Sequence, residues 1–140
     1  MAQTDKVLYT AKTRTTGGRE GASRSEDGHL DVQLTTPGTA GTPGTNPEQL
    51  FAAAYSACFI GAMQTVAGKM GARLPDDTAV DAEVDLCDLP DGAYRIAVRL
   101  QVHLPGMDRG EAQKVLDAAG KIWPYAHGSR DTIGMALTLA

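Results

Sequence analysis

The stretch from residue 45 to residue 71, TNPEQLFAAAYSACFIGAMQTVAGKMG, contains the strongest helix signal in the chain. Asn46 is a residue type that caps helices, Pro47 suits the first helical position, and Gln49 follows three residues after the cap. A glycine closes the stretch and supplies the left-handed conformation with which many helices end. The sequence therefore predicts one long helix from Asn46 to Met70.

The central part of this helix is apolar or small on every side. Within residues 50–63 only Tyr55 and Ser56 interrupt the run, which is typical of a helix that is buried all round. The run is too short to span a bilayer, so we expect it to be buried inside protein. Because little bulk surrounds Cys58, another helix or a small hydrophobic substrate can approach its backbone closely. The small residues are Ala52, Ala53, Ala54, Ala57, Gly61 and Ala62.

Composition and charge limit the class of protein. The 140 residues, 42% of them hydrophobic, fit a single globular domain over residues 1–140. The formal charge of -4 arises from interspersed acids and bases, so we expect neither nucleic acid nor a membrane as a partner. The N-terminal residues lack a long apolar stretch, so we expect no signal peptide and a cytoplasmic location. Cys58 and Cys87 lack the spacing of a disulfide framework or a zinc site, and we expect reduced thiols.

Short strands are expected before the long helix. Residues 6–15, 19–25 and 30–34 are separated by turn signals and predict an antiparallel meander of three strands. In the third strand, apolar and polar residues alternate, so one face should cover a core. Residues 36–45, TPGTAGTPGT, predict a loop that lacks the lysine of a phosphate-binding P-loop.

Two more strands, a second helix and a final strand are expected after the long helix. Alternation predicts strands at 80–86 and 94–104, with Cys87 on the polar face. The second helix, DRGEAQKVLDAAGKIW (108–123), begins with an aspartate that can cap it, and residues 133–139 alternate as a strand does. The order β-β-β-α-β-β-α-β predicts an α+β fold. The apolar stripe of the second helix comprises Ala112, Val115, Leu116, Ala119 and Ile122.

Cys58 admits two interpretations from the residues alone. Buried free cysteines often act as small hydrophobic residues that fill a tight helix crossing. The alternative is a nucleophilic thiolate, but the helix dipole gives little help to a sulfur in the middle of a helix. A thiolate there needs a partner cation, and the candidates are Arg19 and Arg130, each of which can equally be a solvated charge on a turn.

Glu48 lies in the first turn of the helix, where the dipole favours a carboxylate and explains the residue fully. Ten residues separate it from Cys58, which in a straight helix means about 15 Å along the axis and about 80° around it. The two side chains therefore cannot touch within one straight helix. If both belong to one site, either the helix breaks or a second subunit supplies one of them, so a symmetric dimer with shared sites is expected.

The histidines and the other polar residues indicate no metal or cofactor site. His29 and His127 fall in loops and His103 on the polar face of a strand, which is typical of surface histidines. Their spacing forms neither a metal-ligand cluster nor a Ser-His-Asp arrangement. We expect neither a metal nor a cofactor.

Several motifs together resemble the organic hydroperoxide resistance (Ohr) proteins of the OsmC/Ohr family, over essentially the whole chain. They are KVLYTAKTRTTGGREG near the N-terminus, LDVQLTTP, GTNPEQLFAAAYSACFIGAM and LPGMDRGEAQKVLDAA. The resemblance implies an intertwined α+β homodimer in which two long helices lie at the centre and the sheets wrap around them. Such a dimer would explain the small residues around Cys58.

The resemblance also implies a thiol peroxidase that reduces organic and fatty-acid hydroperoxides to alcohols. Cys58 then corresponds to the peroxidatic cysteine, and Arg19 and Glu48 correspond to the arginine and glutamate of the site. The arginine favours the thiolate, the glutamate holds the guanidinium by a bidentate pair, and attack on the peroxide leaves a sulfenic acid. We assign Phe59, Trp123 and Tyr125 to substrate binding on the same basis.

One position departs from the family pattern. The family has a resolving cysteine in a Cys-Pro-Tyr-Ser type of motif, whereas this chain has IWPYAHGSR, with Trp123 at that place. Trp123 either packs in the core or narrows the thiol pocket and binds the tail of the peroxide. Cys87 is a poor substitute, because strand alternation directs it to the polar face, away from the helix.

Three hypotheses remain open. In the first, which we prefer, the chain is a one-cysteine peroxidase whose Cys58 is recycled by an external thiol, a dihydrolipoyl group in the usual Ohr enzymes. In the second, it is a sensor or a hydrophobic-ligand binder on the same scaffold, without useful turnover. In the third, the dimer is structural and Cys58 is a core residue.

Overall fold

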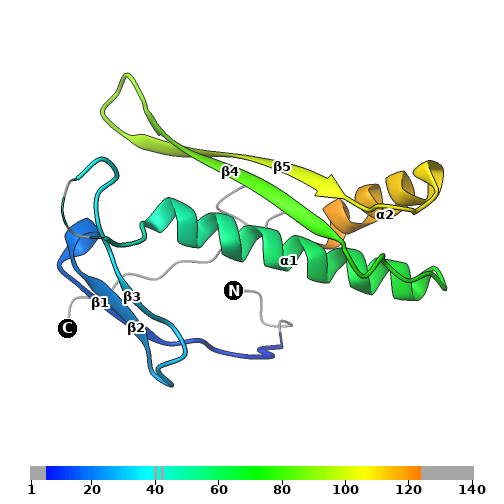
Figure 1. Cartoon of the computed structure of the whole chain (residues 1–140), viewed down its shortest axis with the longest axis horizontal. Helices are drawn as coiled ribbons and strands as arrows, with labels where there is room; N and C mark the ends of the chain where they lie inside the picture. The colour runs from blue at the N-terminus through cyan, green and yellow to red at the C-terminus, as the bar shows by residue number, and fades with distance from the viewer. Residues whose placement is uncertain (1–5, 40, 42, 124–140) are drawn as a thin grey trace. The chain divides into compact units, whose positions relative to one another are not determined.

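The structure, a computed structural model, describes residues 6–39, 41 and 43–123. The chain forms two compact units, Met1–Phe51 and Ala52–Ala140, and each is described here by itself. The order of elements within the described residues matches the predicted order (Figure 1). The final strand predicted at 133–139 and the loop before it lie outside the described residues.

The first unit contains an antiparallel meander, as predicted, formed by β1 (Thr13–Thr16), β2 (Ala22–Ser25) and β3 (Asp31–Gln33). The first predicted strand was too long, because residues 6–12 are not strand. The second was also too long at its start, where Gly18–Glu20 form the short 3-10 helix η1. Gly17 and Gly18, with positive φ of 73° and 57°, form this turn, so β2 begins only at Ala22.

The long helix α1 spans Pro47–Lys69, close to the predicted bounds. Asn46 caps it, since its side-chain oxygen accepts a 2.9 Å hydrogen bond from the backbone N–H of Gln49. Gly71 has φ 72°, and the N–H of Ala72 donates back to the carbonyl of Ala67, so the helix ends in the left-handed manner that was predicted.

The burial of α1 was predicted incorrectly for the single chain. Only one side of the helix is buried, and Cys58 is exposed. The exposed side contains small residues, namely Ala53, Ala54 and Ala57. The apolar stretch was expected to be too short to span a bilayer, but by length and composition alone α1 could cross a membrane, a property that the core helix of a soluble protein shares. Apolar residues all round the helix do not show which sides the chain itself covers, and this accounts for the error.

The second unit contains a long hairpin of β4 (Ala79–Asp88) and β5 (Tyr94–His103), paired antiparallel throughout. The predicted alternation is present, and Cys87 pairs with Arg95 on the polar face. Near the turn, however, Leu86, Tyr94 and Ile96 are exposed in the single chain, by 50%, 70% and 46%. The apolar face of the hairpin therefore extends beyond the part that the core covers.

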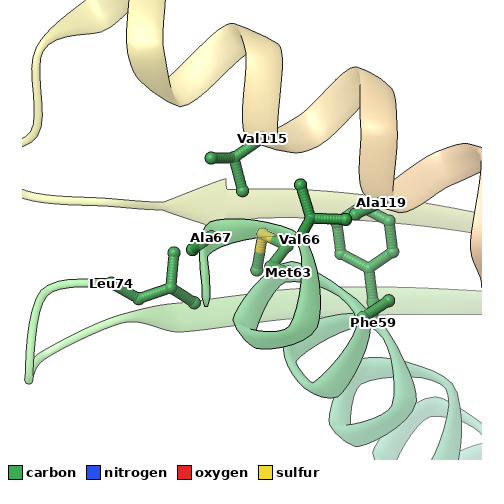
Figure 2. Close-up of a cluster of buried hydrophobic side chains, with 8 residues drawn as sticks. Phe59, Met63, Val66, Ala67, Leu74, Val115 and Ala119 are labelled. Carbon is green, nitrogen blue, oxygen red and sulfur yellow. The ribbon is translucent and has the colours of Figure 1, made fainter. Parts of the chain in front are cut away.

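Helix α2 (Arg109–Ile122) packs against α1 and forms the core with it. Asp108 caps α2 as predicted, accepting a hydrogen bond from the N–H of Glu111. The stripe of α2 faces the core except at Ile122, which is 51% exposed, contrary to the prediction. Figure 2 shows the side chains of this core meeting between the two helices, with the hairpin alongside. They include Phe59, Met63, Val66, Ala67, Leu74, Val115 and Ala119.

Candidate functional site

Cys58 lies in the middle of α1 on its exposed side. The next residue, Phe59, points into the core and is only 7% exposed. Because successive helix positions are about 100° apart, Cys58 points away from the core that Phe59 enters. Cys58 is therefore not a core residue of the single chain, and both interpretations, a residue at a helix crossing and a thiolate, stay hypotheses.

Trp123 packs against the helical turn that contains Cys58. Its ring meets the ring of Tyr55 edge-on at 4.2 Å between centroids, and the ring of Phe59 at 4.9 Å. Tyr55 and Phe59 are four residues apart and share one side of α1. The three aromatic rings therefore form an apolar cluster beside Cys58, which we call the Trp123 cluster, and this packing was one of the two alternatives for Trp123.

Arg19 and Glu48 meet in the first unit although 29 residues separate them in the sequence. A guanidinium nitrogen, Nη2, donates a 2.7 Å hydrogen bond to Oε2 of Glu48. The glutamate side chain is 17% exposed and the arginine side chain 42%. Arg19 belongs to η1 and Glu48 to the first turn of α1. A bidentate pair was expected, but the structure shows a single hydrogen bond between the two side chains.

The ion pair fixes the charges of both groups. The hydrogen bond from Arg19 lowers the pKa of Glu48, although partial burial acts in the opposite direction. The same bond to Glu48 raises the pKa of Arg19. At neutral pH the carboxylate and the guanidinium are therefore both ionised, and the arginine has donors left over for a further anion.

The continuous helix removes one of the alternatives for combining Glu48 with Cys58. Helix α1 runs without a break from Pro47 to Lys69. Ten residues of regular helix place Glu48 and Cys58 about 15 Å apart along its axis. If these residues act together, Glu48 and Arg19 serve the Cys58 of another chain.

The remaining candidates are surface groups or lie outside the described residues. His29 is 3.4 Å from Asp27, and His103 is 2.8 Å from Asp81. Cys87 is half-buried, and both cysteines are free thiols. Within the described residues, His, Cys, Asp and Glu form no group of three or more that could hold a metal. Tyr125, His127 and Arg130 lie outside these residues.

One residue without a predicted role, Gln33, is hydrogen-bonded to the backbone next to the turn that carries Arg19. Its side-chain amide donates a 3.0 Å hydrogen bond to the carbonyl of Gly21, directly after the turn that carries Arg19. In the sequence Gln33 is simply the polar member of an alternating strand. That pattern gives no signal for a specific partner, because the partner is 12 residues away.

The chain is similar to known proteins over its whole length. The family model described as OsmC-like protein matches residues 37–133. The organic hydroperoxide resistance protein of Xanthomonas axonopodis pv. citri is 48% identical over 143 residues, which cover 100% of both chains. The protein OhrB of Bacillus subtilis, an organic hydroperoxide resistance protein, is 40% identical over 95% of this chain and 98% of its own.

Solved structures show the same fold. The crystal structure of Bacillus subtilis OhrB has a TM-score of 0.80 and 41% identity, covering 89% of this chain and 93% of that one. The α+β fold and its order of elements therefore agree with those of a solved relative. With a family model matched over most of the chain and full-length relatives at this level of identity, this chain belongs to the OsmC/Ohr family.

Proposed function

We propose that this protein is a thiol-dependent peroxidase that reduces organic hydroperoxides to alcohols through Cys58. The observation that carries the proposal is the 2.7 Å contact between Arg19 and Glu48, in a chain whose relatives are named for hydroperoxide resistance. The chain has the cation that a mid-helix thiolate needs and a carboxylate that holds this cation in place. The exposed sulfur of Cys58 is accessible to both an arginine and a substrate from outside the chain.

The proposed first step is an attack of the Cys58 thiolate on one oxygen of the hydroperoxide. The O–O bond breaks, a bond forms between Sγ and the attacked oxygen, and the other oxygen leaves as the alkoxide, which takes a proton to become the alcohol. Cys58 is oxidised by two electrons to the sulfenic acid while the peroxide is reduced. Arg19 stabilises the thiolate before attack, and its position depends on Glu48.

The proposed second step uses an external thiol. A thiol attacks the sulfenic sulfur and forms a mixed disulfide, releasing water, and a second thiol then displaces Cys58 as a free thiol. A dithiol such as a dihydrolipoyl group supplies both sulfurs. Trp123 stands where the family has its resolving cysteine, and Cys87 lies at the far end of β4 on the polar face.

The proposed active unit is a homodimer in which both chains contribute to each of two sites. We propose that this dimer is cytoplasmic. Within one chain, ten residues of helix separate Glu48 from Cys58 by about 15 Å along the axis of α1. Two chains that place their α1 helices side by side in opposite directions can bring the pair of one chain to the thiol of the other. The small exposed residues around Cys58 allow such a close approach of two helices.

The proposed substrate is a hydroperoxide with an apolar alkyl group. The Trp123 cluster provides an apolar wall beside Cys58, and edge-on aromatic packing holds its rings in place. We therefore assign Phe59 and Trp123 to the wall of the pocket; Tyr125, outside the described residues, stays assigned to substrate binding from the sequence resemblance. The indole of Trp123 narrows the proposed pocket, and bulky polar peroxides should therefore bind less well.

A sensor on the same scaffold is the second candidate, favoured by the tryptophan that replaces the resolving cysteine. In that case oxidation of Cys58 is itself the output. Steady-state reduction of an alkyl hydroperoxide, with dihydrolipoamide or glutathione as donor, separates the two. We expect turnover with dihydrolipoamide in the parent and none in Cys58→Ser; a single stoichiometric oxidation without turnover supports the sensor.

Thiol counting tests the fate of the sulfenic acid. One equivalent of hydroperoxide should consume one thiol per chain if Cys58 acts alone, and two if Cys87 resolves it. Absence of rapid thiol consumption contradicts both the peroxidase and the sensor.

Arg19→Ala tests the role of the cation. Because an opposite charge nearby favours the ionised form of a thiol, removal of the arginine should raise the pH at which Cys58 reacts. Alkylation of Cys58 by iodoacetamide over a pH series, followed by peptide mass spectrometry, measures this shift. An unchanged pH profile excludes Arg19 from the site.

A further inference from the structure

The short helix η1 that carries Arg19 is tied to strand β3 at its C-terminal end. Gly21, directly after η1, uses its carbonyl oxygen for two hydrogen bonds, from the N–H of Leu34 at 2.8 Å and from the side-chain amide of Gln33 at 3.0 Å. A side chain on Gly21 would collide with the carbonyl of Thr16, so the end of this turn has no room for a side chain. The position of the backbone at Arg19 thus depends on these two hydrogen bonds.

The first turn of α1, which carries Glu48, is tied to the same strand. The N–H of Thr45 donates a 2.9 Å hydrogen bond to the backbone carbonyl of Gln33. The hydroxyl of Thr45 in turn donates to the side-chain oxygen of Gln49 at 2.7 Å, inside the first turn of the helix. Glu48 lies between these two residues, so its position follows from the register of Thr45 against Gln33.

Gln33 is therefore hydrogen-bonded to the backbone near each member of the ion pair. Its side chain holds the turn of Arg19, and its backbone carbonyl holds the entry to the helix of Glu48. We propose that Gln33 is a positioning residue that aligns Arg19 with Glu48 and, through Arg19, sets the reactivity of Cys58. The first half concerns geometry within the described residues; the second half rests on the proposed function.

Positioning of this kind matters because the ion pair is a single hydrogen bond. A guanidinium and a carboxylate that share only one contact, of 2.7 Å, have no second bond to correct their alignment. Arg19 is also partly exposed, so its side chain has room to turn away if η1 shifts. The amide of Gln33 restrains that shift without touching either charged group.

The test replaces the amide donor and keeps the size of the side chain. Gln33→Met removes the hydrogen bond to Gly21, and its backbone carbonyl still accepts from Thr45. Gln101→Met is the matched control, an exposed glutamine in β5 for which the described residues show no side-chain hydrogen bond. If Gln33→Met fails to fold, Gln33→Glu replaces it, because that variant keeps the size and loses the N–H donor at neutral pH.

Two measurements are made on each variant. The first is the guanidinium signal of Arg19 in a ¹H–¹⁵N spectrum, assigned with Arg19→Ala, which reports the bond to Glu48 independently of any activity. The second is the pH midpoint of Cys58 alkylation, which a merely structural residue would not move in a folded protein. We expect Gln33→Met to shift the Arg19 signal and to raise the midpoint, by less than Arg19→Ala does, while Gln101→Met changes neither.

The outcomes separate the two halves of the proposal. An unchanged Arg19 signal in Gln33→Met overturns the positioning role, whatever happens to the reactivity of Cys58. A shifted signal with an unchanged pH midpoint in both Gln33→Met and Arg19→Ala supports the alignment of the pair and overturns its link to Cys58, and with it the role of Arg19 in the proposed function. A shifted signal with a midpoint that moves only in Arg19→Ala overturns the second half alone.

Discussion

Arg19 and Glu48 each stabilise the ionised form of the other. The hydrogen bond between them lowers the pKa of the carboxyl and raises the pKa of the guanidinium, so both charges persist at neutral pH. The glutamate is the less exposed partner, with 17% of its side chain accessible. At the scale of residues, the carboxylate therefore acts as the fixed group and the arginine as the group that it orients.

We expect Glu48→Gln to slow the oxidation of Cys58 by an alkyl hydroperoxide about tenfold. Hydrogen bonds to charged groups contribute roughly 1.5 to 3 kcal/mol, and a neutral amide retains part of that. Stopped-flow measurement of thiol oxidation gives the rate constant. Glu20→Gln is the control, since Glu20 is an exposed neighbour of Arg19 without an ion pair among the described residues; an equal loss in both variants contradicts the assignment.

The lowered pKa of Glu48 also predicts how stability depends on pH. Because the pKa of the folded state lies below the ordinary value of 4.5, the ion pair stabilises the fold above that value. Its contribution is lost as the pH falls through the pKa of the folded state. Urea unfolding over a pH series should show the parent more stable than Glu48→Gln at neutral pH, with a gap that closes below pH 4.5. If the difference in unfolding free energy between the parent and Glu48→Gln increased as the pH is lowered, the ion pair would not be what stabilises the fold.

Helix α1 has a buried side that packs in the core and an exposed side that carries Cys58. One side carries Phe59, Met63 and Val66 into the core against α2 and the hairpin (Figure 2). The other side carries Cys58 among small exposed residues. Because the helix is continuous, the packing of the first side fixes the direction in which the second side presents the thiol.

Met63→Ala should destabilise the protein strongly. The side chain of Met63 is fully buried, with 0% exposed. Truncating a buried methionine to alanine costs about 2 to 5 kcal/mol of unfolding free energy, through lost burial and the cavity left behind. Met70→Ala, directly after α1 and 43% exposed, should cost less than about 0.5 kcal/mol. Urea unfolding measures both, and similar losses would contradict the described core.

At the scale of the whole molecule, the single chain leaves apolar surface uncovered. On the hairpin, Leu86 pairs with Ile96 and Asp88 with Tyr94, so the three exposed apolar side chains gather on one face of its end. Exposed apolar patches of this kind mark surfaces that other protein covers. Together with the exposed side of α1, this face supports the proposed homodimer.

Ile96→Lys should weaken that dimer. A charge placed in an apolar interface is costly to bury, whereas Gln101→Lys puts the same charge on the polar face of β5. Sedimentation equilibrium is expected to give about twice 14.7 kDa for the parent and for Gln101→Lys, and a concentration-dependent loss of mass for Ile96→Lys. Hydroperoxide reduction should fall with the dimer fraction, because the sites are shared. A monomeric parent that is fully active would falsify the shared site.

The amino-acid sequence by itself determined the features that depend on neighbours along the chain. The caps at Asn46 and Asp108, the stop at Gly71 and the pairing of the hairpin strands follow from local hydrogen bonds and from periodicity. The family also follows from the sequence, since its motifs extend over the whole chain. The start of the second strand was less accurate, because the turn that begins at Gly17 and Gly18 continues to Glu20, within the predicted strand.

Only the tertiary structure decided which distant residues meet. Arg19 reaches Glu48 across 29 positions, and Gln33 reaches Gly21 across 12, because the meander folds back to the entry of α1. Burial of Cys58 was predicted incorrectly for the single chain for the same reason. Hydrophobic periodicity states which residues avoid water, whereas the packed fold decides which of them the chain covers itself and which it leaves for another molecule.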